Sequence, residues 1–190
     1  FRTVKEMVGQ VQKIDASKAT DNYKTRGLDL SAILHRPEGE GSHILSNTEK
    51  QDHGLENVLD MTINRDAKAA IEHKVPTELN YKIQNTDRTV GAIISNEISK
   101  IHGKEGLPED TLKLNFSGSA GQSFGGFAAK GVTMTVEVET NDYLGKGLSG
   151  AKIIIKKPAV ADFIAEENII TGNVSFYGAV SGEAYINGIA

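Results

Sequence analysis

Glycine is concentrated in the second part of the chain, and this distribution limits the fold more than any other feature of the sequence. Twelve of the 20 glycines follow Ser117, although that part of the 190-residue chain is the shorter one. Within a strand-rich segment, glycine marks corners that need a positive φ or places where two backbones come close. We therefore expect the chain after Ser117 to have a different architecture from the chain before it.

Short strands bounded by glycine recur in this second part at a spacing of about twenty residues. The sequences VTMTV, AKIIIK and EAYI each follow a glycine corner. Repeats of this kind suit a coiled solenoid, a parallel β-helix, better than a sandwich, and a meandering antiparallel sheet stays open as the alternative. The residues expected at the structural corners are all glycines: Gly118, Gly121, Gly125, Gly145, Gly147, Gly150, Gly178 and Gly182.

The chain before these repeats is expected to contain two parts. Residues 1–54 are predicted to form an α-helical or irregular lead-in, with a turn-rich linker at residues 37–46 (PEGEGSHILS). Residues 55–190 are predicted to form the β-rich domain, which begins with helices. Within it, apolar residues at helical spacing predict a helix that Thr89 caps and that ends near His102 and Gly103.

Three patterns resemble catalytic or ligand motifs but lack the context that the chemistry needs. Gly121–Gly125 fits G-x-S-x-G, yet the triad order requires a histidine after the serine, and the last histidine is His102. Gly145–Gly150 fits G-x-G-x-x-G, yet a strand rather than a helix is expected to follow. The five histidines are scattered without metal-ligand spacing. We therefore predict no catalytic, cofactor-binding or metal-binding residues.

Charge and cysteine content narrow the function classes further. A formal charge of −4 gives no electrostatic reason to expect nucleic acid or a membrane surface as a partner. The chain has no cysteine, which excludes disulfides, cysteine nucleophiles and thiolate-held iron–sulfur clusters within it. No apolar run approaches the length of a membrane span, so a soluble, cytoplasmic protein is expected.

Three long motifs occur in order between Arg88 and Gly150: GLPEDT, GSAGQSFGGF and NDYLGKGLSG. With them, the chain strongly resembles the C-terminal, GXGXG-motif domain of the glutamate synthase large subunit. The segment from Glu167 to Ala190 resembles the next block of that family, and FRTVKEMVGQ resembles the end of the preceding synthase region.

The resemblance implies a right-handed parallel β-helix without catalytic residues of its own. It implies a parent enzyme that makes glutamate from glutamine and 2-oxoglutarate and passes ammonia through an internal tunnel. FMN and an iron–sulfur cluster are expected elsewhere in that enzyme. The expected partners are the other domains of the large subunit and the small subunit, and an open end of the β-helix would favour self-association.

Two alternatives stay open at this point. The β-helical subunit of formylmethanofuran dehydrogenase has a similar glycine-rich pattern and also lacks the redox centre. A stand-alone binding module would use the surface of the coils for a small ligand or a protein. The main hypothesis is a non-catalytic structural domain that positions the glutaminase and FMN-dependent synthase domains.

Overall fold

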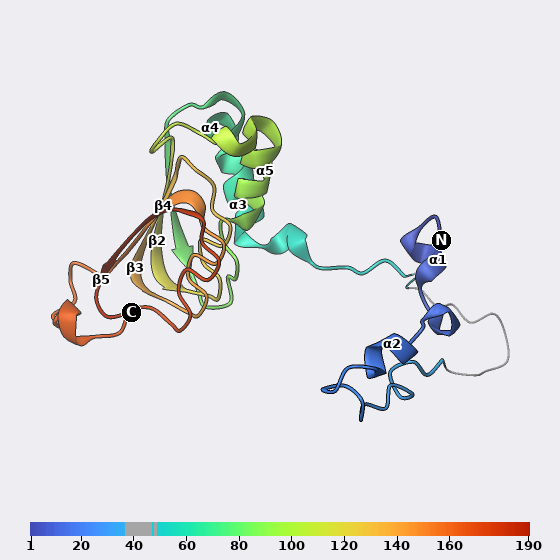
Figure 1. Ribbon diagram of the computed structural model, residues 1–190. Coiled ribbons are helices and arrows are strands. Elements are labelled where there is room, and N and C mark those ends of the chain that lie inside the picture. The colour runs from blue at the N-terminus through green and yellow to red at the C-terminus, as the bar shows by residue number, and fades with distance from the viewer. Residues whose placement is uncertain (37–46, 48) are drawn as a thin grey trace. The chain divides into compact units, whose positions relative to one another are not determined.

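The computed structural model describes residues 1–36, 47 and 49–190 and divides the chain into two compact units, Phe1–His53 and Gly54–Ala190 (Figure 1). The linker predicted at residues 37–46 lies outside the described residues. The assignment of residues 1–54 to the end of a synthase region stays a prediction.

The described residues of the first unit form only short helical elements. These are α1 (Val4–Met7), a 3-10 turn (Val11–Lys13) and α2 (Ser17–Thr20), and none of their residues is buried. Helices of this length are marginal without packing against other elements. The described residues of this unit therefore supply no core of their own.

The second unit holds the sheet and the longer helices. Its 3-10 turns are Leu55–Asn57, Gly103–Glu105 and Ala165–Glu167, and its helices are α3 (Leu59–Asp66), α4 (Lys68–His73) and α5 (Ala92–His102). Its strands are β1 (Thr77–Ile83), β2 (Leu112–Ala120), β3 (Val132–Thr140), β4 (Ser149–Lys156) and β5 (Ser181–Asn187).

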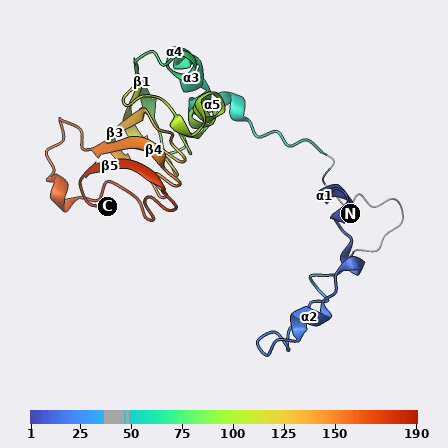
Figure 2. The ribbon, with the colours of Figure 1, turned by 45° about the horizontal axis from the view of Figure 1, so that its top comes forward.

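The five strands form one sheet in the order β1-β2-β3-β4-β5, and every neighbouring pair is parallel. Helix α5 lies in the connection from β1 to β2, as expected for a parallel pair. Leu112 pairs with Val132, so the spacing of twenty residues seen in the sequence reappears in the register. Figure 2 shows the helices of this unit near the β1 end of the sheet, while β5 lies at the opposite edge.

The predicted right-handed parallel β-helix is wrong. The described residues form one five-stranded, all-parallel sheet with helices, as in an α/β fold, and not a closed solenoid of strands. The segments that a solenoid would use as further strands are turns instead: residues 122–127, 142–147 and 175–178. Positive φ angles at Ser123, Phe127 and Tyr143 take this backbone out of the β region. We call these three segments the turn wall.

One continuous core joins the sheet, the helices and the turn wall. Alternate residues of β2, namely Leu112, Leu114 and Phe116, point into it because successive side chains of a strand face opposite sides. The Phe116 ring meets the Phe124 ring edge-on at 5.2 Å between centroids. Phe124 belongs to the turn wall, so this pair connects the sheet to the turns.

Candidate functional site

The turn wall overlaps both of the sequence motifs that resemble ligand sites: it contains residues 122–125 of the first and 145–147 of the second. Its three segments are connected by backbone hydrogen bonds: the Gly145 amide donates to the Phe124 carbonyl at 2.8 Å, and the Gly147 amide donates to the Tyr177 carbonyl at 2.8 Å. The Phe127 amide donates to the Lys146 carbonyl at 2.8 Å. These three backbone amides are therefore already hydrogen-bonded within the protein and are not free to bind a phosphate.

The geometry around Ser123 does not build a nucleophile. Its backbone has a φ of 60° and its amide donates to the Asp142 carbonyl at 2.9 Å. The side chain of His102, the last histidine in the chain, contacts the Ile71 carbonyl through Nε2 at 2.7 Å instead. Within the described part of the chain, no histidine is hydrogen-bonded to Ser123, so the general base that acyl transfer requires is not placed there.

The G-x-G-x-x-G pattern likewise lacks its helix. β4 begins at Ser149, inside the motif, and runs to Lys156. A dinucleotide fingerprint needs a helix whose N-terminus points at the pyrophosphate. The structure places a strand there, as the sequence indicated.

Seven of the eight predicted corner glycines have a positive φ. They are Gly118, Gly125, Gly145, Gly147, Gly150, Gly178 and Gly182. Gly121 is the exception, but a Cβ there would lie 2.5 Å from the Asn85 carbonyl oxygen. That these eight glycines act as structural corners stays a prediction, which the loss of stability on replacing them would test.

Sequence reasoning missed Asp60, the buried carboxylate of α3. One oxygen accepts from the Gly91 amide and the other from the Ile93 amide, both at 2.8 Å, so Asp60 satisfies the N-terminus of α5 from another helix. The prediction that Thr89 caps this helix is therefore wrong. Burial raises the pKa of Asp60, and its hydrogen bonds from the backbone amides act in the opposite direction. No local signal could have identified it, because the partners are 31 and 33 residues away.

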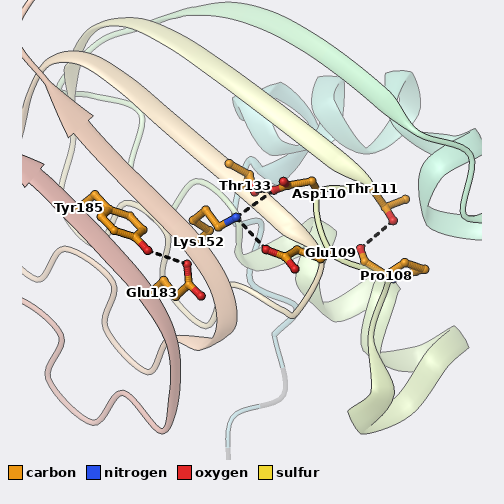
Figure 3. A network of polar contacts seen from close by, with 8 residues as sticks. All are labelled: Pro108, Glu109, Asp110, Thr111, Thr133, Lys152, Glu183 and Tyr185. Atoms are coloured by element: carbon orange, nitrogen blue, oxygen red, sulfur yellow. Dashed lines mark hydrogen bonds and ion pairs between the residues drawn. The ribbon is translucent and has the colours of Figure 1, made fainter.

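The solvent-facing side of the sheet carries rows of polar side chains. One row runs across all five strands through the paired positions Glu78, Lys113, Thr133, Lys152 and Glu183. Figure 3 shows Glu109 and Asp110, in the turn before β2, next to Lys152 of this row. Lys152 Nζ lies 3.0 Å from Glu109 Oε1 and 3.3 Å from Asp110 Oδ1, and the Thr133 hydroxyl donates to Asp110 Oδ1 at 2.6 Å.

These contacts favour the charged forms of Asp110 and Lys152. The hydrogen bond from Thr133, followed by that from Lys152, lowers the pKa of Asp110. The contact with Glu109, followed by that with Asp110, raises the pKa of Lys152. A carboxylate and an ammonium held charged in this way suit an ion pair rather than proton transfer near neutral pH. The network therefore fastens the GLPEDT turn to β3 and β4.

The described residues contain no group of three or more histidine, cysteine, aspartate or glutamate side chains arranged to hold a metal ion. No helix in this part of the chain is long and apolar enough to cross a membrane.

The model of the GXGXG motif family matches residues 60–190. The chain belongs to the GXGXG motif family. It is also 47% identical over 192 residues to the glutamate synthase [NADPH] large chain of Bacillus subtilis, and 47% identical over 195 residues to the glutamate synthase [NADH] of Schizosaccharomyces pombe. The ferredoxin-dependent glutamate synthase 2 of Synechocystis is 37% identical over 192 residues.

These alignments cover 100% of this GXGXG chain but only 12%, 9% and 12% of the three relatives. The predicted resemblance to glutamate synthase is therefore confirmed. The chain therefore spans about a tenth of the length of these relatives.

Proposed function

We propose that this chain is a non-catalytic structural domain of a glutamate synthase and that it positions the glutaminase and FMN-dependent synthase domains. The observation that carries the proposal is the 47% identity along the whole chain to a glutamate synthase large chain, of which it covers 12%. The parent enzyme would make L-glutamate from L-glutamine and 2-oxoglutarate, with ammonia passed between the two active sites. FMN and the iron–sulfur cluster would bind in other domains.

The contacts within the second unit support a positioning role. The sheet and the turn wall are each hydrogen-bonded from one repeat to the next, and Phe116 and Phe124 pack between them. A close-packed body with two bonded sides deforms little, because a close-packed interior has low compressibility. Such a body can hold other domains at a fixed separation, which the transfer of a small intermediate requires.

The non-catalytic part of the proposal is tested with the 190-residue chain alone. We expect neither glutaminase activity nor glutamate formation from glutamine and 2-oxoglutarate when flavin and metal are left out. Turnover by these residues, abolished by a substitution within them, would contradict the proposal.

The positioning part is tested in the parent large chain. Gly145→Ala places a methyl group against the Phe176 ring, whereas Gly178→Ala has no atom within 4 Å of the added carbon. With Gly145→Ala we expect each half-reaction to survive while more glutamine is hydrolysed for each glutamate formed. Gly178→Ala serves as the matched control. An unchanged ratio in a measurably loosened Gly145→Ala enzyme would contradict the positioning role.

A further inference from the structure

Residues 1–36, which we call the N-terminal segment, leave their apolar side chains exposed. No residue of the segment is buried. Single exposed apolar residues are ordinary on a protein surface, so the informative observation is that the whole segment lacks a buried one. Eight of its large apolar residues are exposed: Phe1, Val4, Met7, Val8, Ile14, Tyr23, Leu28 and Ile33. The segment therefore carries apolar surface that the described residues do not cover.

Helix α1 shows this most clearly. Val4, Met7 and the C-cap residue Val8 stand three and four residues apart, a spacing that places side chains on one face of a helix. Val4 is 76% exposed and Met7 is 54% exposed. A helix of four residues is not stable in water unless such an apolar face packs against another element. α1 therefore has the form of a docking helix whose partner surface lies outside the described residues.

The N-terminal segment has few other means of staying folded. Every hydrogen bond between its described residues joins positions no more than six apart. Chains below about 40 residues usually need disulfides, a metal or association with another protein to fold. The chain has no cysteine, and no group of described residues is arranged to hold a metal ion. Association with another protein surface is the remaining means.

Two boundaries indicate where that surface belongs. The model of the GXGXG motif family matches only from residue 60 onward, so the N-terminal segment lies outside that domain. The alignment with the glutamate synthase large chain of Bacillus subtilis nevertheless covers 100% of this chain and 12% of the relative. The segment is therefore shared with glutamate synthase large chains without being part of their GXGXG domain.

The charge of the N-terminal segment restricts the surface further. The segment contains seven lysines and arginines and four aspartates and glutamates, a net charge of +3, whereas the whole chain has a charge of −4. Interfaces between proteins combine an apolar centre with a polar rim of complementary charge. A matching surface is therefore apolar opposite α1 and acidic around it.

We propose that the N-terminal segment docks onto the part of the glutamate synthase large chain outside the GXGXG domain, and that it folds only in that contact. The identity of the partner rests on the proposed function. Because the segment and its partner surface belong to one polypeptide, the contact forms at a high effective concentration. Docking would fix the point at which the chain enters the second unit, which a positioning role requires.

The test is hydrogen exchange, measured by mass spectrometry on the same peptides of the 190-residue chain and of the parent large chain. In the 190-residue chain, the amides of residues 4–14 should exchange at the rate of an unfolded peptide. In the parent large chain they should exchange at least about 100-fold more slowly, because docking covers them. The amides of β3 should be protected in both proteins. Protection of residues 4–14 in the dilute 190-residue chain, or its absence in the parent, would overturn the proposal.

Two variants of the parent large chain test the apolar face of α1. Met7→Ser removes a side chain from this face and should reduce the protection of residues 4–14 by about tenfold or more. Lys5→Ser, on the same helix but outside the apolar face, is the matched control and should reduce it much less. Neither variant should change exchange in the 190-residue chain. Equal losses in the two variants would overturn docking through the apolar face.

Other partners predict different results. A second copy would make the protection of residues 4–14 depend on the concentration of the 190-residue chain. An anionic membrane would protect them when phosphatidylglycerol vesicles are added. Either result, without protection in the parent large chain, would overturn the proposal. It would leave the proposed function standing, because that function is judged by turnover of the 190-residue chain and by the Gly145→Ala enzyme.

Discussion

The turn wall and the solvent face of the sheet lie in the same repeats but depend on different chemistry. On the solvent face, side chains such as Glu137 and Lys156 pair across neighbouring strands and remain partly exposed. In the turn wall, the backbone itself adopts positive φ angles, and a Cβ added at Gly145 or Gly147 would lie 2.6 Å from a phenylalanine ring of a neighbouring turn. We therefore expect substitutions in the polar rows of the solvent face to cost less free energy of unfolding than substitutions at the stacked glycines of the turn wall.

Removing the contact between Phe124 of the turn wall and Phe116 of the sheet should give the largest loss of stability. Phe124→Ala removes a fully buried ring that packs against Phe116. We expect a loss of about 3–5 kcal/mol in the free energy of unfolding, because the void cannot collapse in a packed core. Urea denaturation measures it. A loss below about 1 kcal/mol would mean that the turns and the sheet are not packed as one core.

The turn wall itself is tested by Gly145→Ala. The new Cβ would lie 2.6 Å from the Phe176 ring at a φ of 60°, so steric overlap adds to backbone strain. We expect a loss of about 2–4 kcal/mol. Gly178→Ala has a φ of 68° and open space around it, so only the strain, about 1 kcal/mol, should appear. Equal losses in the two variants would remove the distinction between a stacked and an open turn.

The hydrogen bonds that connect Asp60 of α3 to the N-terminus of α5 are tested by Asp60→Asn. The amide can accept only one of the two backbone hydrogen bonds, and we expect a loss of about 1–3 kcal/mol at pH 7. The sign of the pH dependence follows from the raised pKa of Asp60. The folded state holds a proton that the unfolded state has already released, so wild-type stability falls as pH rises from the unfolded pKa through the folded pKa.

Asp60→Asn does not titrate, so its deficit relative to wild type should grow as the pH is lowered through that window. Parallel urea titrations of both proteins cancel the contributions of the other acidic groups. A deficit that shrinks toward acidic pH would show that the two amide hydrogen bonds outweigh the effect of burial.

The solvent face should give the smallest effect. Lys156→Ala removes one ion pair, in which Nζ lies 2.8 Å from Glu137 Oε1 and both side chains are more than 40% exposed. We expect a change below about 1 kcal/mol that decreases further in high salt. A loss as large as that of Gly145→Ala would contradict the contrast between the two sides.

Much of the strand content could be predicted from the sequence. Apolar residues that alternate with polar ones, such as Leu79, Tyr81 and Ile83, indicate a strand with one buried face. The spacing of about twenty residues between neighbouring strands such as β2 and β3 was also predicted from the sequence. The closed β-helix was not correct, because glycine corners do not reveal whether the next segment is a strand or a turn. That choice depends on φ angles at residues such as Ser123 and Tyr143, which propensity alone does not favour.

The site was harder to predict for a different reason. Asp60 obtains its role from hydrogen bonds to a segment more than 30 residues away. Thr140 in the sequence is an ordinary strand residue, and only the fold shows that its hydroxyl is buried without a hydrogen-bond partner among the described residues. Motif spacing instead highlighted Ser123 and the G-x-G-x-x-G segment, which the structure uses in stacked turns and a strand.

A scaffold role requires the turn wall to be as rigid as the sheet, and native-state hydrogen exchange measures this most directly. The amides of Phe127, Gly145 and Gly147, which bond from turn to turn, should exchange with opening free energies close to those of the β3 amides. Exchange of these turn amides by local opening, while β3 stays protected, would contradict a single rigid body.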